Sequence, residues 1–286
     1  MHVHNVEDPQ QRMEWTAKFG MFFAGVLYET YGGIVVKPNR IDPTKPPKRK
    51  KRPLRMNAPE VYWVKTADET LVRLTRYEGG KKGPVMMSPG FGVSTLSFST
   101  DTVETNLPEY LYANGYDVWL FDYRASPDLS SASTLFSLDD IAQKDYPAAV
   151  AKVREVTKAP TVQMLAHCIG SMTFLMSMLS GLQGVRSAIC SQLGLFPVTS
   201  TANEVKSGLH IGGFLQALGE TKVDMNLPVN DWRNKLADVL IRLAPRKELC
   251  NSTVCHQVRL IFGDSYKHAN LNAATHDALY EMFGVA

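Results

Sequence analysis

The sequence lacks the features typical of disulfide-rich and membrane-spanning proteins. Only four of its 286 residues are cysteine, too few for a disulfide scaffold. Its longest apolar run, residues 19–28, is shorter than the run of about 20 residues that crosses a bilayer. The polar amino terminus has no pattern of a cleavable signal peptide. We therefore expect a cytoplasmic protein. Since 44% of the residues are hydrophobic, the chain can form a sizeable core.

Acidic residues are absent from residues 45–55, KPPKRKKRPLR, which contain seven basic residues although the whole chain has a net charge of only +3. The interleaved prolines disfavour a helix or strand, so this arm is predicted to be a solvated linker. No aromatic platform accompanies the charge, and we expect no nucleic-acid partner. Residues 13–31 predict an apolar helix that packs on the core or on another domain. Contact of residues 13–55 with an anionic membrane surface is the alternative.

Two of the cysteines lie close together as C-NSTV-C, residues 250–255, followed by His256. This spacing predicts a small disulfide loop, with a metal site as the alternative. A zinc site needs about four ligands, and the sequence shows no second cluster of metal-binding residues. We therefore expect neither a metal nor another cofactor.

Predicted strands and helices alternate along the first two thirds of the chain. Short connections between them predict a mostly parallel, doubly wound sheet with helices on both faces. This α/β domain covers residues 58–286 and follows an amino-terminal region, residues 1–57. A helical insertion at about 193–250 is predicted to form a cap over the site. The strands are predicted at 61–64, 71–76, 84–88, 116–124, 161–166, 185–192 and 258–264, and helices at 105–114, 137–153, 171–179 and 272–283.

The segment AHCIG, residues 166–170, has the frame of a nucleophile elbow between a strand and a helix. Such a turn has a strained backbone, so small residues must flank the nucleophile at both second neighbours, where Ala166 and Gly170 stand. Cys168 occupies the nucleophile position and would attack as a thiolate. The alternative interpretation is a small cysteine buried in a core.

The segment PGFG, residues 89–92, follows a buried strand and predicts an oxyanion loop. Its glycines let the backbone bend so that the amide of Phe91 faces the nucleophile. The amide of Ile169, at the start of the helix after Cys168, would supply the second donor. An ordinary strand-to-helix turn is the alternative.

These elements resemble the α/β-hydrolase-like region that follows the flavin domain in bacterial cholesterol-oxidase-like members of the GMC oxidoreductase family. The residues from Tyr116 to Lys152 are also similar to acid lipases, and the C-I-G elbow is similar to polyhydroxyalkanoate synthases, which use a cysteine in acyl transfer. The resemblance covers most of the chain and implies an α/β-hydrolase fold. It is carried by KRPLRMNAPEVYWVKTADETLVRLTRY, FSTDTVETNLPEYLYANGYDVWLFDYRAS, DDIAQKDYPAAVAKVREVT, AHCIGS, GLQGVRSAICSQ and LNAATHDALYEMFGVA.

The resemblance leaves the catalytic base open. In α/β-hydrolases the acid follows a late strand and the histidine follows the last strand, whereas this sequence ends at Ala286 soon after its last predicted strand. Either the base lies on further chain, with the sheet here lacking its last strand, or a histidine of this sequence serves. His268 is the candidate base and Asp264 the candidate orienting acid. Asp122 and Asp140 are less favoured candidates for the acid. His167 and His276 are expected to have structural roles.

The sequence thus supports two kinds of function. The first is a hydrolase that cleaves an ester or thioester of an apolar acyl or sterol-like compound through Cys168, with acyl transfer to another acceptor as a variant. The second is a catalytically silent hydrolase-like module that associates with a flavin oxidoreductase domain or subunit, or binds a lipid.

Overall fold

The computed structural model describes residues 51–194, 208, 250, 252–263 and 266–284. The chain divides into two compact units. We call residues 51–194 and 272–284 the sheet unit, and residues 208, 250, 252–263 and 266–271 the second unit. Most of the predicted amino-terminal region and most of the predicted cap fall outside the described residues. No helix in the described part is long and apolar enough to cross a membrane.

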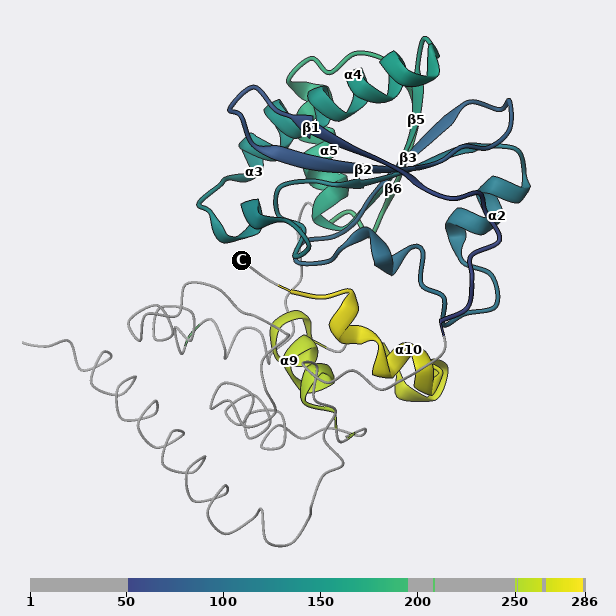
Figure 1. Ribbon diagram of the computed structural model, residues 1–286. Helices are drawn as coiled ribbons and strands as arrows, with labels where there is room; N and C mark the ends of the chain where they lie inside the picture. The colour runs from purple at the N-terminus through teal and green to yellow at the C-terminus, as the bar shows by residue number, and fades with distance from the viewer. Residues whose placement is uncertain (1–50, 195–207, 209–249, 251, 264–265, 285–286) are drawn as a thin grey trace, which may run out of the picture. The chain divides into compact units, whose positions relative to one another are not determined.

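The sheet unit is built on six strands in the order β1-β2-β4-β3-β5-β6 (Figure 1). The first two strands pair antiparallel, β2 joins β4 antiparallel, and β4, β3, β5 and β6 run parallel. The predicted mostly parallel α/β sheet is therefore confirmed. The strands are β1 (Glu60–Lys65), β2 (Leu71–Tyr77), β3 (Pro84–Ser88), β4 (Asp117–Asp122), β5 (Val162–His167) and β6 (Val185–Ser191).

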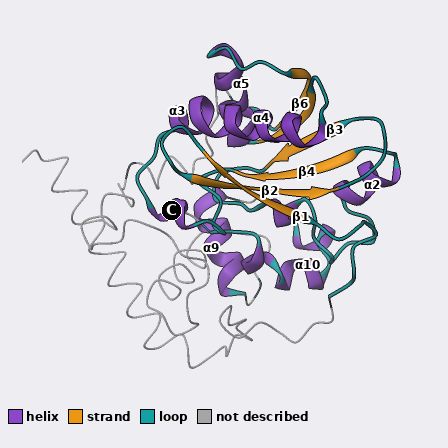
Figure 2. Ribbon diagram, turned by 45° about the horizontal axis from the view of Figure 1, so that its top comes forward, coloured by secondary structure: helices purple, strands orange, loops and turns teal. Residues whose placement is uncertain are grey.

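Helices cover both faces of the sheet, as predicted (Figure 2). Successive side chains of β3 point to opposite faces because a strand alternates with a period of two. Met86 packs into the cluster that contains Tyr146 and Phe174, whereas Met87 packs into the cluster with Leu111 on the other face. The sheet unit contains η2 (Thr95–Ser97), α2 (Leu107–Ala113), η3 (Ser130–Ser133), α3 (Leu138–Asp140), η4 (Ile141–Asp145), α4 (Tyr146–Thr157), α5 (Ile169–Leu179), α10 (Ala273–Asp277) and η6 (Leu279–Glu281).

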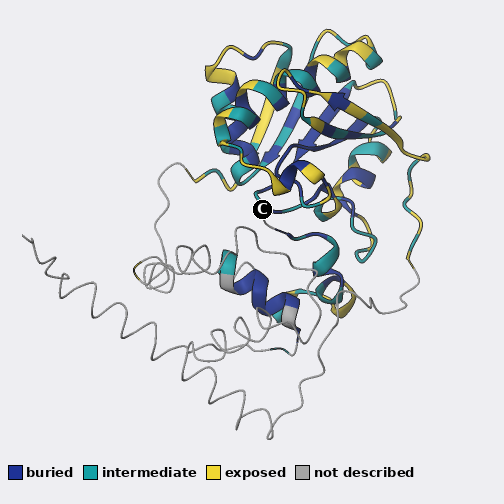
Figure 3. Cartoon of the chain, turned by 60° about the vertical axis from the view of Figure 1, so that its left-hand side comes forward, coloured by how far each residue is buried: buried dark blue, intermediate teal, exposed yellow. Residues whose placement is uncertain are grey.

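The central strands are the most buried part of the sheet (Figure 3). Every residue of β3 and of β4 is buried, which is typical of strands covered on both faces. β6 is more exposed, and Ile189 keeps 64% of its surface accessible. No described residue after β6 adds another strand to this sheet. The carboxyl ends of β3, β4 and β5 therefore meet in the best-packed part of the unit, where a rigid site can form.

One predicted strand is wrong. Residues 253–262, which overlap the expected strand at 258–264, form the helix α9 (Thr253–Phe262) in the second unit. Ser252 caps this helix by accepting a hydrogen bond from the amide of Cys255 at 3.2 Å. Val254 and Val258 are both buried and lie four residues apart, which is helical spacing. A short apolar run such as VRLIF fits either element, and here the cap and the spacing favour the helix.

The end of the basic arm is bound to the sheet unit. Arg52 donates two hydrogen bonds to the carboxylate of Glu109, at 2.6 and 3.0 Å. Glu109 is buried in the first turn of α2, where it forms a capping box with Asn106, and it also accepts the amide of Arg55. The hydrogen bond from Arg52, followed by the backbone donors, lowers the pKa of Glu109 to about 2. This part of the predicted linker thus has a packing role.

Replacing Glu109 by glutamine is expected to lower the free energy of unfolding at pH 7 by about 2 kcal/mol, because a charge-assisted contact is lost. The pKa of Glu109 is depressed in the folded chain, so its stabilisation is complete above the usual value of 4.5 and disappears as the pH falls through about 2. Urea unfolding between pH 7 and 2 tests this. The difference between wild type and variant should shrink over that window. The exposed Glu78, replaced by glutamine, is the control and should show almost no difference at any pH.

Candidate active site

Cys168 lies between β5 and α5 with a strained backbone, φ 54° and ψ −123°. An L-residue rarely adopts this conformation, and it persists only where the surrounding structure imposes it. The strand β5 ends at His167 and the helix α5 begins at Ile169, so the turn has no residue besides Cys168. The predicted strand, sharp turn and helix are therefore all present at the predicted residues.

The small residues at both second neighbours of Cys168 have a steric reason. Ala166 is fully buried. A Cβ atom on Gly170 would lie 2.3 Å from the carbonyl oxygen of Pro89 and 3.0 Å from Oγ of Ser88. The carbonyl of Gly170 accepts a hydrogen bond from Tyr146 Oη at 2.7 Å, and the same hydroxyl is 2.7 Å from Ser88 Oγ. The start of α5 is thus pressed against the end of β3.

The glycine loop after β3 lies directly against the cysteine. A Cβ atom on Gly90 would lie 3.2 Å from Cβ of Cys168 and 3.7 Å from its Sγ. A larger residue at this position would therefore press on Cβ of Cys168. The backbone of the loop can approach the sulfur because Gly90 has no side chain.

Tyr123 fixes the orientation of this loop. Its hydroxyl donates to the carbonyl of Gly90 at 2.8 Å and lies 3.2 Å from that of Pro89. The peptide bond is trans, so the amide of Phe91 points in the direction opposite to the carbonyl of Gly90. The amide of Ile169 belongs to the first turn of α5, where amides have no acceptor within the helix. Both predicted oxyanion donors therefore belong to backbone that adjoins Cys168.

Two further sets of contacts fix the loop. Asp122, fully buried at the end of β4, accepts the amide of Thr95 at 2.9 Å and its hydroxyl at 2.7 Å. Asp122 also accepts hydrogen bonds from Ser126 and Arg73. The carboxyl-terminal segment pairs with the same loop, because the amide of Ser94 donates to the carbonyl of Met282 at 2.8 Å. The contacts of Asp122 are those of a residue that positions the loop, whereas a catalytic acid would contact a histidine.

Asp140, the other acid ranked lower, forms a capping box with Ser137 and an ion pair with Lys144. This confirms the predicted capped helix start and gives Asp140 a structural role. His167 is half-buried, and its Nδ1 lies 3.2 Å from Oγ of Ser191 on β6. Burial lowers the pKa of His167. These contacts agree with the structural role predicted for His167.

The predicted base lies in the second unit, and the predicted acid is not among the described residues. Asp264 lies outside the described residues. His268 belongs to the second unit, where its Nε2 is 3.4 Å from Sγ of Cys255. His276, predicted to be a structural histidine in a helix, lies in α10. The roles of His268 as base and Asp264 as acid therefore stay predictions.

Sequence reasoning missed Tyr123 and Tyr146, whose hydroxyls hold the loop and the elbow. A signal for Tyr123 exists, since it directly follows β4, the strand parallel to β3. Side chains at the carboxyl ends of neighbouring parallel strands meet at one edge of the sheet. Tyr146 has no such signal, because it comes from a helix whose packing the sequence does not reveal.

If the turn acts as the predicted nucleophile elbow, replacing Tyr123 by phenylalanine is expected to reduce kcat roughly tenfold, because the Gly90 carbonyl is no longer held and the Phe91 amide loses its fixed direction. The free energy of unfolding should fall by only about 1 to 2 kcal/mol. Steady-state kinetics and urea unfolding measure both. The exposed Tyr110, replaced by phenylalanine, provides the same chemical change without either effect. An unchanged kcat in the Tyr123 variant would contradict this positioning role.

The sequence is similar to three lipases of Caenorhabditis elegans. It is 27% identical to lipase lipl-3, with 76% of this chain and 60% of that protein covered, and 29% identical to lipase lipl-5, with 68% and 54% covered. Lipase lipl-1 is 28% identical over 49% of this chain and 39% of its own length. The chain thus spans about half the length of the curated relatives that it matches. No family model matches the sequence.

Among solved structures, the Pyrococcus furiosus esterase Pf2001 is similar with a TM-score of 0.45 and 15% identity, covering 69% of this chain and 73% of the esterase. Epoxide hydrolase A from Mycobacterium thermoresistibile has a TM-score of 0.35 and 17% identity, covering 58% of this chain and 46% of that enzyme.

Three features support the same fold. The strand order is β1-β2-β4-β3-β5-β6, and the residue between β5 and α5 has the strained backbone of a nucleophile elbow. The sequence is similar to lipases over up to 76% of the chain. The described chain therefore has the fold of an α/β-hydrolase, and its sequence is similar to lipases.

Proposed function

We propose that this protein hydrolyses a carboxylic ester or thioester through Cys168. The observation that carries the proposal is the placement of Cys168, alone at a strained strand-to-helix turn with Gly90 packed against its sulfur. A buried core cysteine would need neither the strain nor the glycine loop. The similarity to lipases supports ester substrates.

The reaction proceeds in two stages. The Cys168 sulfur attacks the carbonyl carbon as its proton passes to the base, and a carbon–sulfur bond forms. The amides of Phe91 and Ile169 stabilise the negative oxygen of the tetrahedral intermediate. The carbon–oxygen bond to the alcohol then breaks, and the alcohol leaves with the proton from the base. Water, deprotonated by the same base, hydrolyses the acyl-thioester and releases the acid and the free thiol.

His268 is the proposed base and Asp264 the proposed partner that orients its ring. The proposed substrate has an apolar acyl or sterol-like group, which rests on the resemblance and on the predicted helical cap at 193–250. A cap that excluded water would favour transfer of the acyl group to another acceptor, because the acyl-thioester would then persist.

Rapid mixing of the purified chain with p-nitrophenyl butyrate, octanoate and palmitate tests the reaction. We expect a burst of p-nitrophenol close to one equivalent of protein, followed by slower turnover, because acylation precedes hydrolysis of the thioester. The longer acyl chains should give the larger kcat/KM. Absence of both burst and turnover with every ester would overturn the proposed hydrolysis.

A catalytically silent module bound to a flavin oxidoreductase is the second candidate. Catalytic silence would agree with the contact of His268 Nε2 with Cys255 Sγ, which engages the proposed base, and the flavin partner rests on the resemblance. Purification of the native chain in complex with a flavoprotein, together with no burst on any ester, would support this candidate. A burst that is lost in a Cys168 variant would rule it out.

A further inference from the structure

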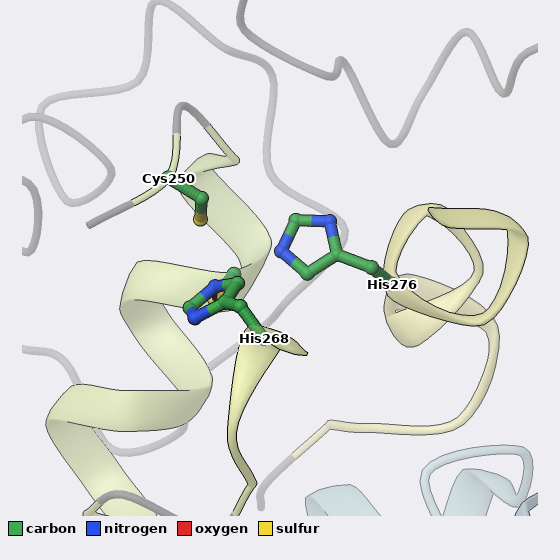
Figure 4. A group of neighbouring side chains, drawn as sticks. Cys250, His268 and His276 are labelled. Atoms are coloured by element: carbon green, nitrogen blue, oxygen red, sulfur yellow. Dashed lines mark hydrogen bonds between the residues drawn. The ribbon is translucent and has the colours of Figure 1, made fainter. Parts of the chain in front are cut away.

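The second unit brings two cysteines and a histidine to one point. Cys255 is in the first turn of α9, Cys250 precedes that helix, and His268 begins η5 (His268–Asn270). The two sulfur atoms and a ring nitrogen of His268 all lie within 4.8 Å of one another. Figure 4 shows the sulfur of Cys250 pointing toward the His268 ring. None of the four cysteines of the chain forms a disulfide, so the disulfide predicted from C-NSTV-C is not present in the structure.

We propose that Cys250, Cys255 and His268 bind a zinc ion. The Sγ of Cys255 and the Nε2 of His268 are 3.4 Å apart. Zinc lies about 2.3 Å from sulfur and about 2.0 Å from nitrogen, so two such ligands of a tetrahedral ion are about 3.5 Å apart. The observed separation therefore already matches one edge of a zinc tetrahedron. The spacing C-x4-C of the two cysteines falls within the range seen in zinc sites.

Neighbouring groups fix these side chains. Tyr266 Oη donates to the sulfur of Cys255 at 2.9 Å, as an outer donor does to a metal-bound thiolate. His256 is fully buried, and its Nε2 is 2.8 Å from the carbonyl oxygen of Cys250, which holds the residues before α9 in place. Cys255 is itself fully buried, so its sulfur is protected from competing ligands in bulk solvent.

The charge of the zinc ion and the protons released when it binds can both be accounted for. Both thiols lose their protons to solvent, and the two thiolates neutralise the charge of the zinc ion, while the histidine binds as the neutral ring. The three named residues leave one position of the tetrahedron, which in a structural site is filled by another side chain of the chain. The ion would join the start of α9 to the loop that carries His268. Its role is therefore structural, because it closes the segment between residues 250 and 268.

The proposed zinc site and the proposed ester hydrolysis share one residue, His268. A histidine that binds zinc through Nε2 cannot accept the proton of Cys168 with that atom. His268 therefore serves only one of the two roles at a time. Zinc content and the ester burst are measured independently, so failure of either proposal is recognised without reference to the other.

The full-length chain, kept reduced, is stripped with a chelator, titrated with zinc or cobalt(II), and analysed for bound metal by mass spectrometry. We expect one zinc per chain, a higher Tm with zinc, and thiolate-to-cobalt charge-transfer absorption of a tetrahedral site. Cys250→Ser and His268→Gln should lose stoichiometric zinc, whereas Cys190→Ser should keep it. Replacing each remaining histidine in turn identifies any further ligand.

Two more measurements separate metal loss from misfolding. Circular dichroism checks that each variant is folded, and Tyr266→Phe, which keeps all three ligands, should weaken zinc binding roughly tenfold. A wild-type chain that binds far less than one zinc per chain would contradict the proposed site. Tight zinc binding by folded Cys250→Ser would also contradict it. Zinc binding lost equally in Cys190→Ser would also overturn the assignment. If His268→Gln loses zinc and keeps the ester burst, the base for Cys168 lies elsewhere.

Discussion

Replacing Cys168 by alanine is expected to abolish the burst and to reduce ester turnover by roughly a thousandfold or more, because the covalent step has no other nucleophile at this turn. The protein should still fold. Alanine is smaller than cysteine, and the sulfur is only half-buried. Stopped-flow kinetics with p-nitrophenyl esters measure the burst, and urea unfolding checks stability.

Cys190 provides the matched control for this change. It lies on β6 directly opposite Ala166 of β5 and is also half-buried. Its replacement by alanine removes the same sulfur from the neighbouring strand. We expect the burst and the turnover to stay within about twofold of wild type, since Cys190 is not at the strained turn. Equal losses in both variants would point to general damage and would contradict the role of Cys168.

Replacing Gly170 by alanine is expected to produce the largest loss of stability. The added Cβ would lie 2.3 Å from the carbonyl oxygen of Pro89, and backbone atoms cannot rotate away as a flexible side chain can. Overpacking of this kind costs about 3 kcal/mol. Relief of the clash must shift Pro89 or the start of α5, and either shift moves Gly90 relative to Cys168. Ester turnover should therefore fall even at temperatures where the variant is folded.

Gly194→Ala is the control for this prediction. Gly194 is exposed, and a Cβ atom there would meet nothing within 4 Å. Its replacement should change the free energy of unfolding by less than about 0.5 kcal/mol. Urea unfolding of both variants, followed by turnover measurements on the folded fractions, completes the comparison. A Gly170 variant as stable and active as wild type would show that the elbow tolerates a larger residue.

The parallel sheet and the elbow could be predicted because their constraints are local in the sequence. The buried run PVMMS of β3 leads directly into a glycine turn, and the elbow needs small residues at fixed offsets from its nucleophile. Each of these patterns lies within about ten residues. Steric limits of the backbone act over that distance and are therefore visible in the sequence.

The second unit was harder to predict because its contacts join residues that are distant in sequence or ambiguous in pattern. The residues around Val258 fit a strand or a helix equally, and the cap by Ser252 decides between them. The pair C-NSTV-C suggested a disulfide, since nothing in the spacing reveals that His268 lies beside Cys255. The hydroxyl of Tyr123 likewise reaches Gly90 across 33 positions of the chain. Such contacts follow from packing, which the periodicity of the sequence does not encode.

The most direct test of the account is intact-protein mass spectrometry of the chain quenched in acid during turnover of p-nitrophenyl octanoate. The acyl-enzyme mechanism predicts a mass increase of one octanoyl group, released by hydroxylamine and located by peptide mapping at Cys168. The adduct should be absent from Cys168→Ala and present in Cys190→Ala. Turnover without any adduct, or an adduct located at another residue, would contradict the proposal that Cys168 is the nucleophile.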